Sequence, residues 1–159
     1  MCDIDVGGDL TAFTGDDVIS ECRRYVALAG EQRTLTSIGP GTDGDWLTDD
    51  DELGGDYARA LLDGAGAVIR RETHAVADDG TATPSADTLI AYTEIDRDAN
   101  HPIVEWRSYL ADDTAVERAV YTVDGDGFVR TEDVYEAGED GSHGTPDDFH
   151  FSRMAWFWL

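Results

Sequence analysis

The chain has 159 residues, of which 35 are acidic and 11 are basic, so its net charge is −24. This length suits a single domain over residues 1–159, and the 41% hydrophobic content excludes a disordered chain. The charge also disfavours direct binding to DNA or RNA, because no arginine cluster exceeds the pairs Arg23-Arg24 and Arg70-Arg71.

The acidic residues are spread along the whole chain, and every basic residue is arginine. This composition resembles that of cytosolic proteins of halophilic archaea, in which carboxylates keep the surface hydrated while molar salt screens their repulsion. An acidic DNA mimic is an alternative, and it would need carboxylates gathered on one surface at phosphate-like spacing. Acidic groups in nearly every loop favour halophilic adaptation.

Cysteine usage and the chain start predict a compartment. The first residues have neither a basic region nor an apolar core of the kind that a secretory signal needs. No apolar run approaches the ~18 residues of a membrane span, so we predict a cytoplasmic protein in a high-salt cytosol with no membrane contact. Cys22 is predicted to be a small buried hydrophobe, and a disulfide with Cys2 is an alternative.

The first half of the chain predicts two helices. Residues 16–29 place Val18, Cys22, Tyr25 and Val26 on one helical stripe, and Gly30 is a natural stop. A second helix is predicted over residues 50–63, after a long polar connection over residues 31–51.

The second half predicts strands, each with β-branched and aromatic residues between turn signals. The clearest unit is a strand over residues 115–123, a tight turn at Asp124-Gly125-Asp126-Gly127 and a strand over residues 128–135. The other predicted strands cover residues 67–77, 88–95, 103–110 and 149–159. We therefore predict an α+β domain with two N-terminal helices packed on a curved, mostly antiparallel sheet of about six strands.

This element order resembles the nuclear transport factor-like superfamily, which includes polyketide-cyclase-like and steroid-isomerase-like members. The resemblance rests on the helix that ends at Gly30, a short helix after Gly54-Gly55, and the strand–turn–strand over residues 120–135. It implies a cone-shaped sheet with an apolar interior, often dimeric, that can hold a small molecule. No residue matches the catalytic Asp or His of that superfamily, so no enzymatic role is carried over.

The final strand is apolar on both faces, which indicates either a central strand or contact with a partner subunit. Its predicted interface residues are Met154, Trp156, Phe157, Trp158 and Leu159. A protein that assembles through this strand should expose part of it when monomeric.

Motifs mostly exclude chemistries. Without lysine there is no Walker A lysine and no Schiff base. The match of residues 39–44 to a dinucleotide-binding glycine pattern contains Pro40 and lacks a flanking strand and helix. The loop that begins at Asp124 fails as a calcium loop, because Phe128 occupies its fifth position. We predict no cofactor.

Two sets of residues are candidate sites. An acidic loop offers oxygen and imidazole ligands for a divalent ion, although an ordinary solvated loop is the simpler interpretation: His143, Asp147, Asp148 and His150. Strand aromatics offer rings that can stack on a ligand, with core packing as the alternative: Tyr92, Trp106, Tyr121 and Trp156.

The sequence thus predicts a non-catalytic binding or assembly protein that self-associates through its C-terminal strand, either as a homo-oligomer or with other protein subunits of a larger particle. The alternatives are a small-molecule binder or enzyme with an apolar pocket, and the DNA mimic.

Overall fold

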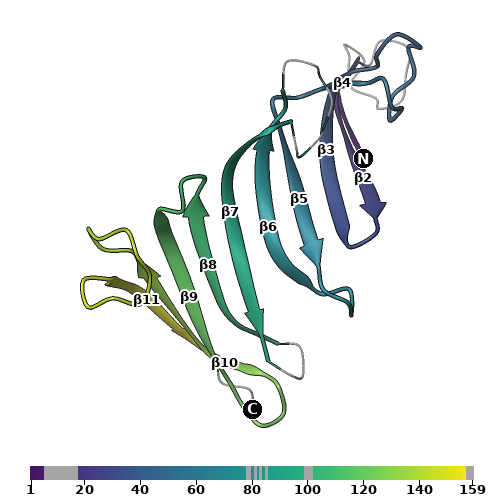
Figure 1. Ribbon diagram of the computed structural model, residues 1–159. Helices are drawn as coiled ribbons and strands as arrows, with labels where there is room; N and C mark the ends of the chain where they lie inside the picture. Colours follow the sequence, from purple (N-terminus) through teal and green to yellow (C-terminus); the bar gives the residue numbers. More distant parts are fainter. Residues whose placement is uncertain are drawn as a thin grey trace. The chain divides into compact units, whose positions relative to one another are not determined.

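The computed structural model describes residues 1–5, 18–77, 80, 82, 84, 86–98 and 102–156, and in these ranges all regular structure is β (Figure 1). The strands are β1 (Cys2–Asp5), β2 (Val18–Leu28), β3 (Glu31–Gly39), β4 (Glu52–Leu53), β5 (Asp56–Leu62), β6 (Val68–Ala75), β7 (Thr88–Arg97), β8 (Ile103–Leu110), β9 (Ala115–Val123), β10 (Val129–Glu136) and β11 (Phe149–Ala155). In the described residues there is no helix with the length and apolar character needed to cross a membrane.

The strands form one antiparallel sheet in which hydrogen-bonded neighbours follow the order of the sequence. The order is β1-β2-β3-β5-β6-β7-β8-β9-β10-β11, and β4 pairs with β3. The chain contacts group into two compact units: the first comprises Met1–Arg59 and Thr73–Leu89, and the second comprises Ala60–Glu72 and Ile90–Leu159.

The predicted α+β fold is wrong, since both predicted helices are replaced by strands. From Val18 onward the first of them is β2, in which Cys22, Arg24 and Val26 lie opposite Ser37, Leu35 and Arg33 of β3. The β-branched and aromatic residues of this segment suit a pleated strand, and pairing with β3 overrides the helical period. Gly30, predicted to stop a helix, instead turns the β2–β3 hairpin with φ 78°.

The second predicted helix is also wrong, because residues 50–63 supply the end of a loop, then β4 and β5. The backbone N–H of Gly54 donates to the carbonyl of Thr36 at 2.7 Å, which seats this segment against β3. The cone implied by the resemblance requires these helices, so the described residues do not form it.

The strands predicted in the second half are confirmed as β6 to β11. The Asp124 carboxylate accepts hydrogen bonds from the N–H groups of Asp126 and Phe128 at 3.0 and 2.9 Å, and Gly127 adopts φ 86°. This turn chemistry is local, which explains why the hairpin could be predicted. The residues of the last predicted strand beyond Trp156 lie outside the described ranges.

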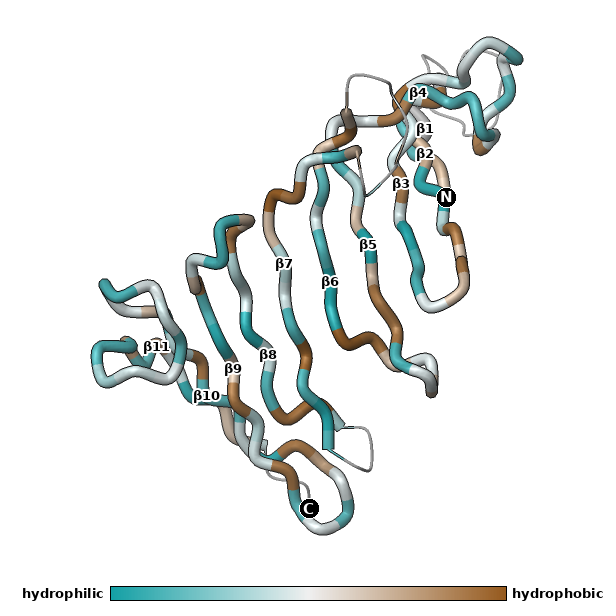
Figure 2. The backbone as a smooth tube through the Cα atoms, viewed as in Figure 1, coloured by the Kyte–Doolittle hydropathy of each residue, from teal (hydrophilic) through white to brown (hydrophobic). Residues whose placement is uncertain are grey.

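The core consists of contacts among side chains on the sheet faces. Hydrophilic and hydrophobic residues follow one another along the strands (Figure 2), and the hydrophobic residues that are buried are few. They are Cys22, Leu35, Tyr57, Tyr92, Ile95, Ala115, Ala119 and Val134. No helix is described over either face, and long side chains such as Arg70 and Arg118 lie over rings of the sheet instead.

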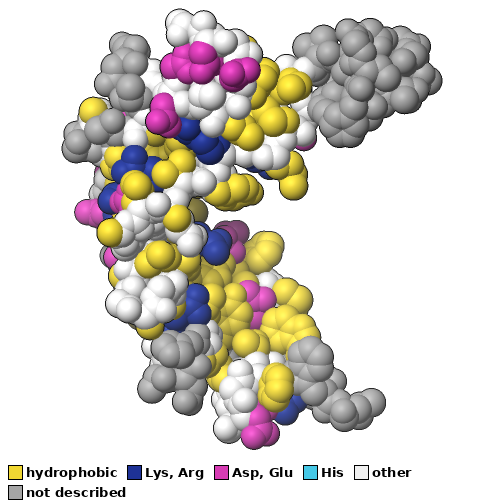
Figure 3. All heavy atoms as spheres, turned by 90° about the vertical axis from the view of Figure 1, so that its right-hand side faces the viewer, with side chains coloured by type: hydrophobic (Ala, Val, Ile, Leu, Met, Phe, Trp, Pro, Cys, Tyr) yellow, Lys and Arg dark blue, Asp and Glu magenta, His cyan; other side chains and the backbone are white. Residues whose placement is uncertain are grey.

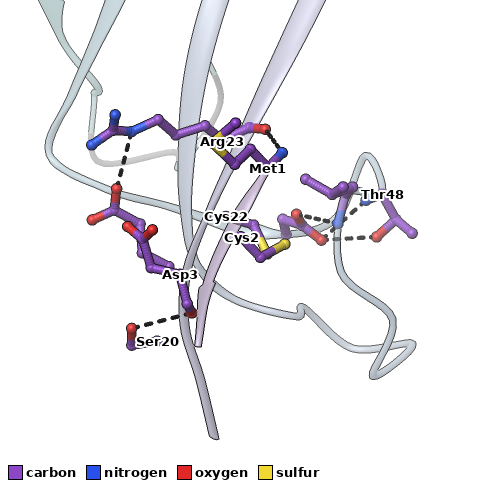
Figure 4. The surroundings of a disulfide bond; sticks show 10 residues. Met1, Cys2, Asp3, Ser20, Cys22, Arg23 and Thr48 are labelled. Carbon is purple, nitrogen blue, oxygen red and sulfur yellow. Dashed lines mark hydrogen bonds and ion pairs between the residues drawn. A yellow bond between two sulfur atoms is a disulfide. The ribbon is translucent and has the colours of Figure 1, made fainter. Parts of the chain in front are cut away.

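A disulfide joins Cys2 of β1 to Cys22 of β2, so the alternative left open for Cys22 is the one that the structure adopts (Figure 4). The two residues are direct cross-strand partners, and Cys22 is fully buried. Beside them the terminal amino group of Met1 donates to the carbonyl of Arg23 at 2.8 Å. The disulfide therefore fastens a four-residue strand that pairs with β2 alone among the described strands.

We expect Cys2→Ser to lower the free energy of unfolding by about 3 kcal/mol, because the bond closes a loop with a sequence separation of 20 residues. Urea unfolding of the oxidised wild type and the variant measures this difference. Reduced wild type serves as the control and should unfold with the variant. A reduced protein as stable as the oxidised one would contradict the prediction.

Candidate functional site

Strand register assigns the side chains of the second unit to two faces of its sheet. Opposite residues share a face and successive residues alternate. Tyr92 lies opposite Tyr109, and Glu94 lies opposite Arg107. Ile95 lies opposite Trp106, so Ile95 and Trp106 share the other face. One face is thus rich in charges and tyrosines, and the other carries apolar rings.

The charged face is held together by arginines stacked on tyrosines. The Arg70 guanidinium lies 3.8 Å from the centroid of the Tyr92 ring, and this ring stacks on Tyr109 at 4.8 Å. Burial raises the pKa of Tyr92 to about 12, with a further contribution from its hydrogen bond to Asp113. Tyr92 therefore stays neutral and serves the packing of this face.

A second cluster on this face surrounds the buried carboxylate of Asp133. It accepts hydrogen bonds from Arg153 at 2.6 Å, and His150 lies 3.0 Å away. The hydrogen bond from Arg153 holds the pKa of Asp133 below its ordinary value. Nearby, the Arg118 guanidinium lies 4.6 Å from the centroid of the Tyr135 ring. The Asp133 carboxylate is therefore paired with a guanidinium and lies beside an imidazole.

The opposite face carries Trp106 and Tyr121, two of the four predicted ligand-binding aromatics. The indole N–H of Trp106 donates to the Tyr121 hydroxyl at 3.0 Å, and this hydroxyl donates to Glu132 at 2.7 Å. A surface pocket of about 370 Å³ opens beside them. Tyr92 lies on the charged face instead. Trp156 continues the β10–β11 ladder by donating its backbone N–H to the carbonyl of Arg130.

The structure does not bring the predicted metal ligands together. The His143 ring nitrogen lies 3.1 Å from the Ser108 carbonyl oxygen, whereas His150 contacts Asp133. The carboxylates of Asp147 and Asp148 accept hydrogen bonds from Thr145 and from backbone N–H groups. The described residues hold no group of three or more side chains placed to bind a metal.

The acidic loop belongs to a repeated element that sequence reasoning missed. Residues 41–51 and 138–148 share the pattern Gly-x-Asp-Gly-x-x-x-Thr-x-Asp-Asp. In both loops the threonine hydroxyl donates to the next two aspartates of the pattern. Thr48 reaches Asp50 and Asp51 at 2.8 and 3.0 Å, and Thr145 reaches Asp147 and Asp148 at 2.7 and 3.2 Å.

The match extends to the backbone of the loops. The last aspartate accepts an N–H from Leu47 in one loop and from Gly144 in the other, at 2.9 and 2.7 Å. These two residues have φ values of 69° and 80°. A Cβ on Gly41 or on Gly138 would collide with Asp50 or Asp147 respectively, which explains the first glycine of the pattern. The shared letters were visible in the sequence, whereas their hydrogen bonds were not.

The strand after the second loop, β11, lies at one end of the strand order and pairs with β10 alone among the described strands. Its side chains are largely exposed: Phe149 and Phe151 at 63% and Met154 at 54%. It is therefore not the central strand that one interpretation of its sequence predicted. Of the predicted interface residues, Met154 and Trp156 are described, whereas Phe157, Trp158 and Leu159 lie outside the described ranges.

Hydrophobic side chains are also gathered over part of the surface in the lower half of Figure 3, where strands of the second unit lie.

Comparison with known proteins does not identify the chain. No family model, no curated protein and no solved structure matches it.

Proposed function

We propose that the chain is a non-catalytic assembly protein that self-associates by pairing β11 with β11 of a second copy. The observation that carries this proposal is an edge strand with exposed aromatic side chains. Edge strands of monomeric proteins are ordinarily protected by charge, proline or cover, because their free backbone groups recruit other strands. From Phe149 to Ala155, β11 contains neither proline nor a carboxylate.

The repeated loop supports the same role for this edge. In the first copy of the pattern the loop follows β3 and leads through β4 into β5, and in the second it follows β10 and leads into β11. β5 has neighbours on both sides, β3 and β6. β11 is its counterpart and has no second neighbour among the described strands, so a further antiparallel strand would complete the arrangement.

Charge favours a second β11 as the partner strand. In a chain of net charge −24, β11 has one charged group, Arg153, and no acidic residue. The strand at the other end of the order, β1, carries Asp3 and Asp5 within four residues. Two copies of β11 can meet around a twofold axis without adding carboxylates to the interface, which gives a closed dimer.

Light scattering of Phe151→Glu tests this function in about 2–3 M KCl, where charge repulsion is screened. The wild type should have the mass of a dimer, and the variant should dissociate at least about tenfold more readily. Tyr25→Glu is the matched control, since Tyr25 is 72% exposed on β2 of the first unit, and its dimer should persist. A monomeric wild type, or an equally stable Phe151→Glu dimer, would refute the proposal.

The disulfide bears on the compartment predicted from charge. Disulfides persist in oxidising compartments and are rare in a reducing cytosol. The Cys2–Cys22 bond therefore favours an oxidising environment for this chain over the high-salt cytosol. Alkylating thiols in intact cells before lysis tests this inference: neither cysteine should take the label, and labelled Cys2 would restore the cytosolic assignment.

A further inference from the structure

Arg71 differs from every other arginine of the chain. All 11 basic residues are arginines, and all lie in the described ranges. The others form ion pairs or hydrogen bonds within the protein. Arg71 forms no ion pair and no side-chain hydrogen bond with any described residue, although the chain contains 35 acidic residues. Its charge is thus left available to something outside the chain.

The neighbouring arginine shows that this difference comes from the face and not from the strand. Arg70 and Arg71 are consecutive in β6 and so point to opposite faces. Arg70 pairs with Glu72 at 2.8 Å and covers the Tyr92 ring on the charged face. Arg71 lies on the other face, where it contributes to the pocket beside Trp106.

The pocket combines this cation with apolar walls. Its volume of about 370 Å³ falls within the range of small-molecule sites. Every residue that lines it belongs to the second unit, and the lining residues are Arg71, Thr93, Ile95, Ile103, Trp106 and Tyr121. Ile95 is buried and lies opposite Trp106, so these two side chains form a preformed apolar wall of the pocket.

The polar ends of the two rings are already engaged. Trp106 donates to Tyr121, and Tyr121 donates to Glu132. The rings therefore present their apolar surfaces, and the Arg71 guanidinium and the Thr93 hydroxyl remain to contact polar groups of a ligand. The Glu132 carboxylate at the end of this chain of hydrogen bonds disfavours a ligand with a second negative charge near Tyr121.

We propose that this pocket binds a small organic monocarboxylate with an aromatic or branched apolar body. The carboxylate pairs with Arg71, for which a two-pronged contact is the favoured geometry. The apolar body lies against Ile95, Ile103 and the Trp106 ring. The site is on a sheet face and does not include β11, so ligand binding and dimerisation are separate properties of the chain.

Titration calorimetry in about 1 M KCl tests the site with 3-phenylpropionate as the probe. Its amine counterpart, 3-phenylpropylamine, has the same body with the opposite charge and should not bind. Arg71→Gln should weaken binding of the acid at least about tenfold and leave the fold intact, since this side chain makes no bond that would be lost. Trp106→Phe should weaken binding too and reduce the change in tryptophan fluorescence.

Arg23→Gln is the matched control, because Arg23 is an exposed arginine of the first unit whose side chain pairs with Glu21, and this variant should bind the acid as wild type does. The proposal is overturned if the amine binds as tightly as the acid, if Arg71→Gln binds as wild type does, or if the acid does not bind at all. None of these outcomes depends on the mass measured for the Phe151→Glu variant.

Discussion

Asp51→Ala is expected to lower the free energy of unfolding by about 3 kcal/mol, although Asp51 lies in a loop. Its side chain is buried and accepts hydrogen bonds from the backbone N–H groups of Leu47 and Thr48 at 2.9 and 3.2 Å, and from the Thr48 hydroxyl. Alanine would leave the two backbone N–H groups without this acceptor, and each part-buried unsatisfied donor costs about 1–3 kcal/mol, whereas the Thr48 hydroxyl keeps Asp50 as an acceptor.

The loop backbone adds to this effect. Leu47 has φ 69°, a conformation that costs a non-glycine residue about 1 kcal/mol or more and that persists only when its surroundings enforce it. The hydrogen bond from its N–H to Asp51 is one such constraint. Without the carboxylate, the loop is expected to relax and to loosen the start of β4.

Urea unfolding of matched variants measures the effect. Asp49→Ala is the control, because the Asp49 side chain is fully exposed and among the described residues pairs with Arg24, so its cost should be small beside that of Asp51→Ala. Asp148→Ala, the equivalent change in the second loop, should cost as much as Asp51→Ala, since it removes the acceptor of the Gly144 N–H and one ion-pair partner of Arg118. Equal costs for Asp49→Ala and Asp51→Ala would show that the loop is not held by these bonds.

The second half of the fold could be predicted because its signals are local. The turn at residues 124–127 needs only its own aspartate and glycines, and the strands on each side alternate in hydropathy. Once one hairpin forms, its neighbours in sequence pair with it, which keeps every connection short.

The first half could not be predicted because its decisive partners are distant. The stripe of Val18, Cys22 and Val26 fits a helix, and Cys22 and Val26 also fit one face of a strand. What selects the strand is pairing with β3 and the bond from Cys22 to Cys2. Neither can be deduced from the local period of hydrophobic residues.

The candidate sites show the same division. Trp106 and Tyr121 could be chosen from their residue types, and the structure joins them. Arg71 could not be chosen, because an arginine is known to lack a partner only when the register of its neighbours is known. The loop pattern was present in the sequence, but the second loop was interpreted from its individual ligand types and not by comparison with residues 41–51.

Acidification from pH 7 to about 4.5 is expected to raise the melting temperature at low salt and to leave it level at high salt. At about 0.1 M KCl the carboxylates that give the chain its charge of −24 repel one another over about 10 Å. Carboxylates ordinarily titrate near pH 4, so lowering the pH from 7 towards 4.5 removes part of this repulsion. The melting temperature should therefore rise over this interval by several degrees.

At about 2.5 M KCl this repulsion is screened and the local carboxylate contacts decide the result. Hydrogen bonds from Thr145 and Arg153 hold the pKa values of Asp147 and Asp133 below the ordinary range. Burial raises the pKa of Asp51, but hydrogen bonds from Thr48 and from backbone N–H groups outweigh it and leave a net decrease. A carboxyl whose pKa is lowered on folding stabilises the folded state above its unfolded pKa, and this stabilisation is lost as the pH falls through the folded value.

In high salt the melting temperature should therefore stay level from pH 7 to about 4.5 and fall below about pH 4, where protons begin to compete with Thr48, Thr145 and Arg153 for these carboxylates. Calorimetric scans between pH 7 and 3 at the two salt concentrations measure both trends. Sucrose in place of KCl is the control, because it stabilises folded chains without screening charge and should preserve the rise on acidification. The same pH dependence at both salt concentrations would mean that neither mutual repulsion nor its screening governs the stability of this acidic sheet.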